Sequence, residues 1–364
     1  MVSRIKNEYD PSEVSPPGET LREVLEEREI SQTELATRMG RPKKTISEII
    51  NGKAAITQET ALQLELVLGI PARFWSAREQ DYREYLARAA QENELARQAE
   101  WAKKFPLAKM QKAGWIEPVS GRTGKVRSLL RFFGVTSPEQ WEEMYALGQA
   151  AFRRSTAFEA DAFALSAWLR QGILEAYEIR CSDFDRTRFV DALEAARALT
   201  RETPEVFQDR LIDWLAEAGV AVTFVPQLPK SRVSGATRWL SANKAMIQLS
   251  LRYRTDDHLW FTFFHEAAHL LLHGKRMVFL ETGKHEGDLE EEANRWAADF
   301  LIPTSDFAEL QERGVFSKQS LLDFAERLGI APGIVVGRLQ HEGLLPYSHC
   351  NELKQRLAWV EDPN

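Results

Sequence analysis

Two histidines and a glutamate occur at the spacing of a metal-dependent hydrolase, in the five residues from His265 to His269 with Glu266 in second place. On an α-helix, residues four apart are separated by about 40° around the axis and about 6 Å along it, so two imidazoles can bind one ion. Zn²⁺ is the usual metal for such a pair, and the adjacent glutamate can act as the general base. Residues 259–272 are otherwise mostly apolar, and buried polar groups need a partner such as a metal. A satisfied pair of core histidines is the alternative interpretation.

A zinc hydrolase needs a third protein ligand, and residues 289–301 offer three neighbouring glutamates. At 100° per residue, Glu290 falls inside the apolar arc of the expected helix, Glu292 falls just outside it, and Glu291 faces solvent. We therefore predict Glu290 as the third ligand, with Glu292 as the alternative. Asn294 follows one turn after Glu290, and we predict that it hydrogen-bonds a ligand histidine from outside.

Four further polar residues are weaker candidates. His273 continues the row four residues after His269, and we expect it to cap the helix or line the site. No residue stands out as a stabiliser of the oxyanion, for which the candidates are His285, Tyr347 and His349.

A second group of polar residues lies between Ser31 and Lys53, where the sequence has the layout of a helix-turn-helix. Ser31 and Glu34 form a capping box, and Gly40 allows a tight turn before the second helix. Recognition helices contact DNA through their N-terminal residues, and phosphates need only a local basic patch. The predicted DNA contacts are Gln32, Arg41, Lys43, Lys44, Thr45 and Ser47. A helical bundle used only for dimerisation is the alternative.

The composition is that of a folded chain with more than one domain, since it has 364 residues, of which 44% are apolar and 28% charged. The net charge of −7 excludes a globally basic nucleic-acid coat but allows a local basic patch. Two cysteines exclude a disulfide scaffold and favour a reducing compartment. We see no signal peptide and no stretch of about 18 apolar residues, so we expect a cytoplasmic protein without a membrane partner.

The elements that must position these residues are mostly helical. Alternating residues predict strands over 220–225 and 245–252, and helical spacing predicts helices over 256–273, 289–301, 320–328 and 332–341. We predict an α+β fold, mostly α, in four parts. These are a five-helix helix-turn-helix domain (1–80), a helical connector (81–205), a metal-binding domain with a small mixed β-sheet (206–310) and a helical C-terminal subdomain (311–364).

Two parts of the sequence resemble known families. The stretch NGKAAITQETALQLELVLGIPARFW, from Asn51 to Trp75, resembles Xre-type repressors, in particular HigA-like antitoxin regulators. This resemblance implies a five-helix domain that binds operator DNA as a homodimer.

The stretches LSLRYRTDDHLWFTFFHEAAHLLLH and EEEANRWAADFLIP, within residues 205–345, resemble the ImmA/IrrE family of metallopeptidases. The resemblance implies a zincin-like domain with Zn²⁺ on His265, His269 and Glu290, with Glu266 as general base. It also implies a helix-turn-helix repressor as the protein substrate. Because this chain joins a DNA-binding domain to the metallopeptidase-like domain, the chain itself is a further candidate substrate.

These observations predict a DNA-binding transcriptional regulator of a stress response whose zinc-dependent metallo-endopeptidase domain hydrolyses a peptide bond in a regulatory protein. We expect the strand over 245–251 to hold an extended substrate by β-augmentation. Two alternatives stay open. One is a non-proteolytic transcription factor whose zincin-like domain senses a ligand or a stress signal, and the other is an antitoxin-type repressor.

Overall fold

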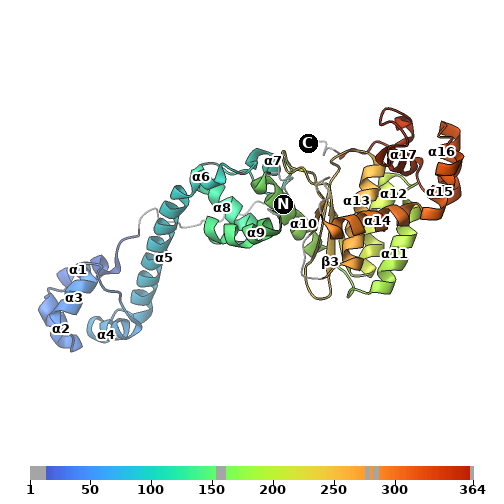
Figure 1. Cartoon of the computed structure of the whole chain (residues 1–364). Coiled ribbons are helices and arrows are strands. Elements are labelled where there is room, and N and C mark those ends of the chain that lie inside the picture. The colour runs from blue at the N-terminus through green and yellow to red at the C-terminus, as the bar shows by residue number, and fades with distance from the viewer. Residues whose placement is uncertain (1–13, 153–160, 275–278, 282–286, 361–364) are drawn as a thin grey trace, which may run out of the picture. The chain divides into compact units, whose positions relative to one another are not determined.

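The computed structural model describes residues 14–152, 161–274, 279–281 and 287–360, and the chain divides into two compact units between Gln98 and Ala99. The chain is mostly helical and has a small mixed sheet in its second unit, which confirms the predicted fold class (Figure 1). No helix in the described parts of the chain combines the length and apolarity needed to cross a membrane.

The first unit is a helical domain that contains the helix-turn-helix. Its helices are α1 (Pro17–Glu27), α2 (Gln32–Met39), α3 (Lys43–Ile50), α4 (Gln58–Leu68) and α5 (Ala72–Arg97). Ser31 caps α2 by accepting the backbone N–H of Glu34 at 3.1 Å, and Gly40 ends it at a φ of 63°. A Cβ at Gly18 would lie 2.2 Å from the carbonyl oxygen of Ile49, so a glycine is needed for α1 to approach α3 this closely.

The second unit contains a four-stranded sheet with the strand order β1-β3-β2-β4. Its strands are β1 (Val220–Phe224), β2 (Gly235–Trp239), β3 (Ala245–Leu249) and β4 (Phe279–Glu281). The strand β3 runs parallel to β1 and antiparallel to β2, and β2 pairs antiparallel with β4. Because β3 is buried and hydrogen-bonded on both edges, our prediction that it holds an extended substrate is wrong.

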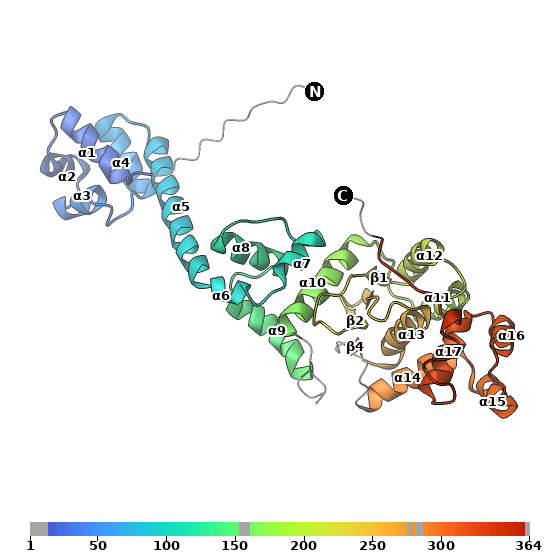
Figure 2. The ribbon, with the colours of Figure 1, turned by 90° about the horizontal axis from the view of Figure 1, so that it is seen from above.

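Helices cover both faces of this sheet (Figure 2). On one face, Ile173 and Ala176 of α10 (Ala162–Glu178) pack against Ala221 and Met246. The other face packs against α11 (Arg186–Leu199), α12 (Pro204–Glu217) and α13 (Asp256–Leu272). Alternate residues of the buried strands therefore pack into two different apolar layers, one on each face of the sheet.

The remaining helices precede α10 or follow α13. The first group is α6 (Ala99–Ala102), α7 (Leu107–Lys112), α8 (Arg122–Phe133) and α9 (Pro138–Phe152). The second group is α14 (Asp288–Leu301), α15 (Thr304–Arg313), α16 (Lys318–Leu328), α17 (Pro332–His341) and the short 3₁₀ helix η1 (Asn351–Leu353). One hydrophobic core extends from Phe189 of α11 through Trp260 of α13 to Val335 of α17. The division into four domains stays a prediction.

Candidate metal centre and candidate DNA-binding surface

The helix α13 carries the two histidines and is held at its N-terminus by the end of the chain. The Asp256 carboxylate accepts the backbone N–H of Gln355 at 3.0 Å, and Lys354 lies 2.6 Å from the Asp257 carboxylate. Gly333 of α17 leaves room for Asp256, because a Cβ there would lie 2.5 Å from Oδ1 of that aspartate. Burial and the neighbouring Asp257 charge raise the pKa of Asp256 to about 7. These contacts fix where α13 begins.

Three potential metal ligands meet between α13 and α14. His265 Nε2 lies 3.2 Å from one Glu290 oxygen, His269 Nε2 lies 3.6 Å from the other, and the two Nε2 atoms are 3.0 Å apart. Tetrahedral zinc with bonds of about 2.0–2.1 Å places its ligand atoms about 3.3 Å apart, so this donor set fits Zn²⁺. The three side chains are the group that we predicted as ligands, and their assignment to a metal remains a prediction.

The protonation states of this group suit metal binding. Burial lowers the pKa of His269 to about 4, although the Glu290 carboxylate partly offsets the effect. Burial also acts to raise the pKa of Glu290, but hydrogen bonds and charge from His265 and His269 outweigh it and hold that pKa at about 2. At neutral pH His269 is therefore neutral and Glu290 is ionised, which are the forms that bind metals.

A chain of hydrogen bonds sets the orientation of His269 from behind. His273 Nε2 lies 3.3 Å from the Glu292 carboxylate, and its Nδ1 lies 2.8 Å from His269 Nδ1. The carboxylate can only accept, so His273 Nε2 carries the proton and its Nδ1 accepts from His269 Nδ1–H. This leaves the lone pair of His269 Nε2 for an ion. Glu292, the alternative third ligand, is thus paired with His273 in this structure.

Glu266 lies beside this group with no exposed surface. Thr237 of β2 donates a hydrogen bond to the Glu266 backbone carbonyl at 3.2 Å and ties α13 to the sheet. A Cβ at Gly235 would lie 2.7 Å from Glu266 Oε1 and 2.6 Å from the Thr262 methyl carbon. Gly235 is therefore needed for the glutamate to occupy this place, and our sequence analysis missed it because the strand β2 itself was not predicted.

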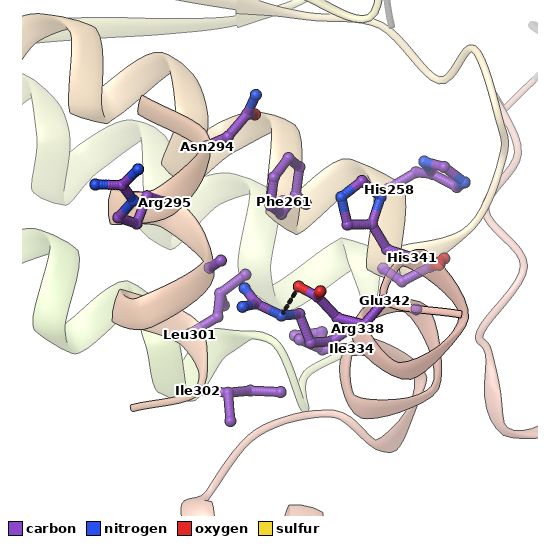
Figure 3. Close-up of a pocket in the computed structure, with 13 residues that line it drawn as sticks. His258, Phe261, Asn294, Arg295, Leu301, Ile302, Ile334, Arg338, His341 and Glu342 are labelled. Atoms are coloured by element: carbon purple, nitrogen blue, oxygen red, sulfur yellow. Dashed lines mark ion pairs between the residues drawn. The ribbon is translucent and has the colours of Figure 1, made fainter. Parts of the chain in front are cut away.

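Asn294 does not make the predicted contact in this structure. Its Oδ1 is buried and has no hydrogen-bond partner among the described residues, and the side chain lines a cavity (Figure 3). The hydrogen bond to the Nδ1 atom of His269 comes from His273 instead. A role for Asn294 next to the metal stays a prediction.

The three residues predicted as candidates to stabilise the oxyanion are not brought to the metal ligands by any described contact. His285 lies outside the described residues. Tyr347 is 71% exposed in the segment after α17, where the ring of His349 hydrogen-bonds Ser348.

The helix α3 of the first unit carries four of the six predicted DNA contacts, three of them in its N-terminal turn. Lys43 and Lys44 are exposed, and the Lys44 side chain, which is 86% exposed, lies 3.8 Å from Glu48. Thr45 and Ser47 are half-buried on the same helix. Two exposed cations and two shorter, half-buried polar side chains therefore share this helix.

Arg41 and Gln32 are placed differently. Arg41 Nε lies 2.5 Å from the Gln63 amide oxygen, and its guanidinium forms an ion pair with Glu59 at 3.1 Å. Gln32 is half-buried in the first turn of α2. The Arg41 side chain thus links the turn before α3 to α4.

Comparisons with known families match these two regions. Residues 21–75 match the helix-turn-helix family model, and residues 217–340 match the model described as the IrrE N-terminal-like domain of peptidase family M78. The chain therefore joins a helix-turn-helix domain to an IrrE N-terminal-like domain. The second match includes β1, β2, β3 and both helices of the candidate metal centre.

Individual relatives match a short part of the chain. Over 59 residues the chain is 37% identical to YddM, an uncharacterized HTH-type transcriptional regulator of Escherichia coli. The aligned segment covers 16% of this chain and 63% of YddM. Two solved structures each match 22% of this chain. They are an addiction module antidote protein of a HigA family from Coxiella burnetii (28% identity, 90% of its length, TM-score 0.21) and an antidote protein of a plasmid maintenance system from Nostoc punctiforme (30%, 88%, 0.22).

The IrrE N-terminal-like domain also contains a cavity of about 330 Å³ between α13, α14 and α17 (Figure 3). Apolar side chains line much of it, among them Phe261, Leu301 and Ile334. The Phe261 ring also stacks on the His265 ring, with centroids 6.3 Å apart. Arg338 adds a charge that is paired with Glu342 at 3.0 Å. A mostly apolar cavity therefore adjoins one potential metal ligand.

Proposed function

We propose that this protein is a DNA-binding regulator whose IrrE N-terminal-like domain is a zinc-dependent endopeptidase. The observation that carries the proposal is the approach of His265, His269 and Glu290 to one another beside the buried Glu266. Two imidazoles and one carboxylate as ligands, with an adjacent carboxylate as base, are the side chains of a catalytic zinc site.

Each side chain has a distinct role in the proposed hydrolysis. His265, His269 and Glu290 hold the ion, and Zn²⁺, when bound, supplies a Lewis acid that polarises the peptide carbonyl. Glu266 accepts the proton of the attacking water and then delivers it to the leaving amine. The pair formed by His273 and Glu292 keeps the proton of His269 on Nδ1, so that Nε2 stays a ligand.

The surroundings of the site support an extended peptide substrate with a large apolar side chain. The cavity beside Phe261 offers room and apolar contacts for such a side chain. The strand β4 pairs only with β2 among the described residues, and we propose that the peptide adds along its other edge by β-augmentation. We infer that the substrate is a helix-turn-helix repressor or a second copy of this chain.

The helix-turn-helix domain is the proposed operator-binding part. Lys43 and Lys44 are placed to contact phosphates and Thr45 to contact base edges. We propose a homodimer, because Leu62 and Leu66 of α4 are 58% and 86% exposed one helical turn apart. Replacing Leu66 with lysine should then yield monomers in sedimentation analysis, whereas an unchanged dimer would place the contact elsewhere.

Mass spectrometry of cleavage products tests the peptidase. Full-length protein loaded with Zn²⁺ is incubated with candidate helix-turn-helix repressors and alone, beside Glu266→Gln and the exposed control Glu291→Gln. We expect fragments from the wild type and from Glu291→Gln but none from Glu266→Gln, which should keep its metal. Cleavage by Glu266→Gln at the wild-type rate would refute the proposed base. No cleavage by any variant would favour the non-proteolytic sensor.

A further inference from the structure

A second cavity, of about 760 Å³, lies in the second unit and shares no lining residue with the candidate metal centre. Five cationic side chains line it, namely Lys109, Lys112, Lys230, Arg232 and Arg252. Two indoles, those of Trp115 and Trp359, and the Gln227 amide also line it, and no aspartate or glutamate is among its described lining residues. Its volume is within the range of small-molecule sites.

The loop that supplies Lys230 and Arg232 is held in place by hydrogen bonds. Arg252 donates to the Arg232 carbonyl at 2.6 Å, the Lys230 carbonyl accepts the Asp161 N–H at 3.0 Å, and the buried Ser231 hydroxyl donates to a carbonyl of the same loop at 2.8 Å. Lys230 and Arg232 have φ angles of 67° and 50°, which residues other than glycine rarely adopt. Such backbone strain clusters at ligand-binding segments.

The charge of this cavity favours an anion. Lys109, Lys112 and Lys230 form no ion pair with any described residue, although the chain as a whole carries a net charge of −7. The positive charges of these three lysines on one concave surface repel one another and attract a ligand that carries several negative charges. A phosphate chain is such a ligand, because lysine and arginine bind phosphate oxygens by charge-assisted hydrogen bonds.

The two indoles add a preference for a flat aromatic group. Trp115 is stacked parallel to Phe132, with centroids 6.5 Å apart, which holds the indole in one orientation. Trp359 is half-buried near the end of the described chain. Indole faces stack on nucleobases regardless of base identity. We propose that this cavity binds a free nucleotide, with its phosphates against the lysines and arginines and its base against an indole.

Titration of the full-length protein at low salt tests this proposal. Tryptophan fluorescence and calorimetry would follow four titrants: ATP, adenosine, inorganic triphosphate and a short single-stranded oligodeoxynucleotide. We expect ATP to bind, and adenosine and triphosphate to bind at least about tenfold more weakly, since each lacks one half of the recognised ligand and about 1.4 kcal/mol corresponds to that factor. Added salt should weaken ATP binding.

Variants decide whether binding occurs in this cavity. The double substitution Lys112→Ala with Lys230→Ala should weaken ATP binding by more than about tenfold. The matched control, Lys103→Ala with Lys318→Ala, removes two exposed lysines of the same unit outside the cavity and should leave it unchanged. Trp359→Ala should weaken binding and Trp359→Phe should restore it.

Four results would overturn the proposal. They are no ATP binding, binding that the cavity variants leave intact, triphosphate binding as tight as that of ATP, and binding of the oligonucleotide without the mononucleotide. The first two refute the site, the third reduces it to an anion site, and the fourth indicates a strand-binding surface. None of them depends on the peptidase activity.

Discussion

The candidate metal centre and the recognition helix present their polar side chains in opposite ways. His265 and Glu266 have no exposed surface, and their neighbours are held by hydrogen bonds from a strand, a second helix and the chain end. Lys43 and Lys44 are exposed, and among the described residues Lys44 forms a single ion pair, with Glu48 at 3.8 Å. The first region is therefore a buried site whose side chains contact one another, whereas the second is an exposed surface.

This difference predicts different responses to substitution. A buried polar group that loses its partner keeps the full cost of its burial, so one change in the metal centre affects metal, fold and activity together. An exposed lysine contributes a screened interaction that salt weakens and that neighbours can replace. Variants of the two regions test this contrast.

Loss of a histidine ligand should have the largest effect. The wild-type protein should contain about one Zn²⁺ per chain, and His265→Ala or His269→Ala should contain almost none, because two remaining ligands rarely hold the ion. The exposed His349 supplies the control, and His349→Ala should keep its zinc. Elemental analysis of the purified variants measures this, and full zinc in His269→Ala would disprove the assignment.

Loss of His273, which hydrogen-bonds His269, should reduce zinc binding less than loss of a ligand histidine. His273→Ala removes the acceptor of the His269 Nδ1 proton, and we expect zinc affinity to fall by about 10–100-fold while the fold is kept. Competition with a chelating dye measures the affinity. An unchanged affinity would mean that the hydrogen bond between the two histidines does not orient His269.

Gly235 tests how tightly the sheet packs on the helix. Gly235→Ala forces Glu266 or the strand to move, and we expect the free energy of unfolding to fall by about 1–3 kcal/mol. Gly274→Ala is the matched control, since its Cβ would meet nothing within 4 Å. Equal stability of the two variants in chemical denaturation would show that the site relaxes easily.

Asp256 should make stability depend on pH. Its pKa of about 7 in the folded protein exceeds the value of 3.8 in the unfolded chain. The stability that protonated Asp256 contributes to the fold is therefore fully present below about pH 4 and is lost as pH rises through 7. Asp256→Asn keeps Oδ1 as acceptor and stays neutral. Relative to wild type it should gain at least about 1 kcal/mol of stability between about pH 5 and pH 8. A constant difference across this range would contradict the raised pKa.

The smallest effects should come from the exposed helix. Lys44→Ala should weaken binding to operator and random DNA alike and reduce the salt slope by about one. Thr45→Ala should instead reduce the preference for the operator. Arg41→Ala should mainly destabilise the first unit, because it breaks the contacts with Gln63 and Glu59. Mobility shifts at two salt concentrations and thermal unfolding separate these outcomes.

Much of this architecture could be predicted from local patterns. Helical periodicity indicated α13, α14 and α17, and alternation indicated β1 and β3, because these elements bury regular faces. The arc of α14 singled out Glu290, which does lie against both histidines. Ser31 and Gly40 marked the ends of α2.

The rest depends on contacts between distant segments. Gly235 is needed because Thr262 and Glu266, 27 and 31 residues later, occupy the space of its Cβ. The pairing of His273 with Glu292 follows from how α13 meets α14, and sequence spacing within either helix does not encode it. The placement of β3 between two strands likewise arises from sheet order, which a single strand pattern does not contain.

The central claim is that His265, His269 and Glu290 form one metal site, and the two neighbouring carboxylates test it most directly. Zinc affinity is measured by chelator competition for wild type, Glu290→Gln and Glu292→Gln under identical conditions. We predict a loss of zinc in Glu290→Gln and at most a small change in Glu292→Gln, because the glutamine oxygen can still accept from His273. Equal losses, or a larger loss in Glu292→Gln, would contradict the account.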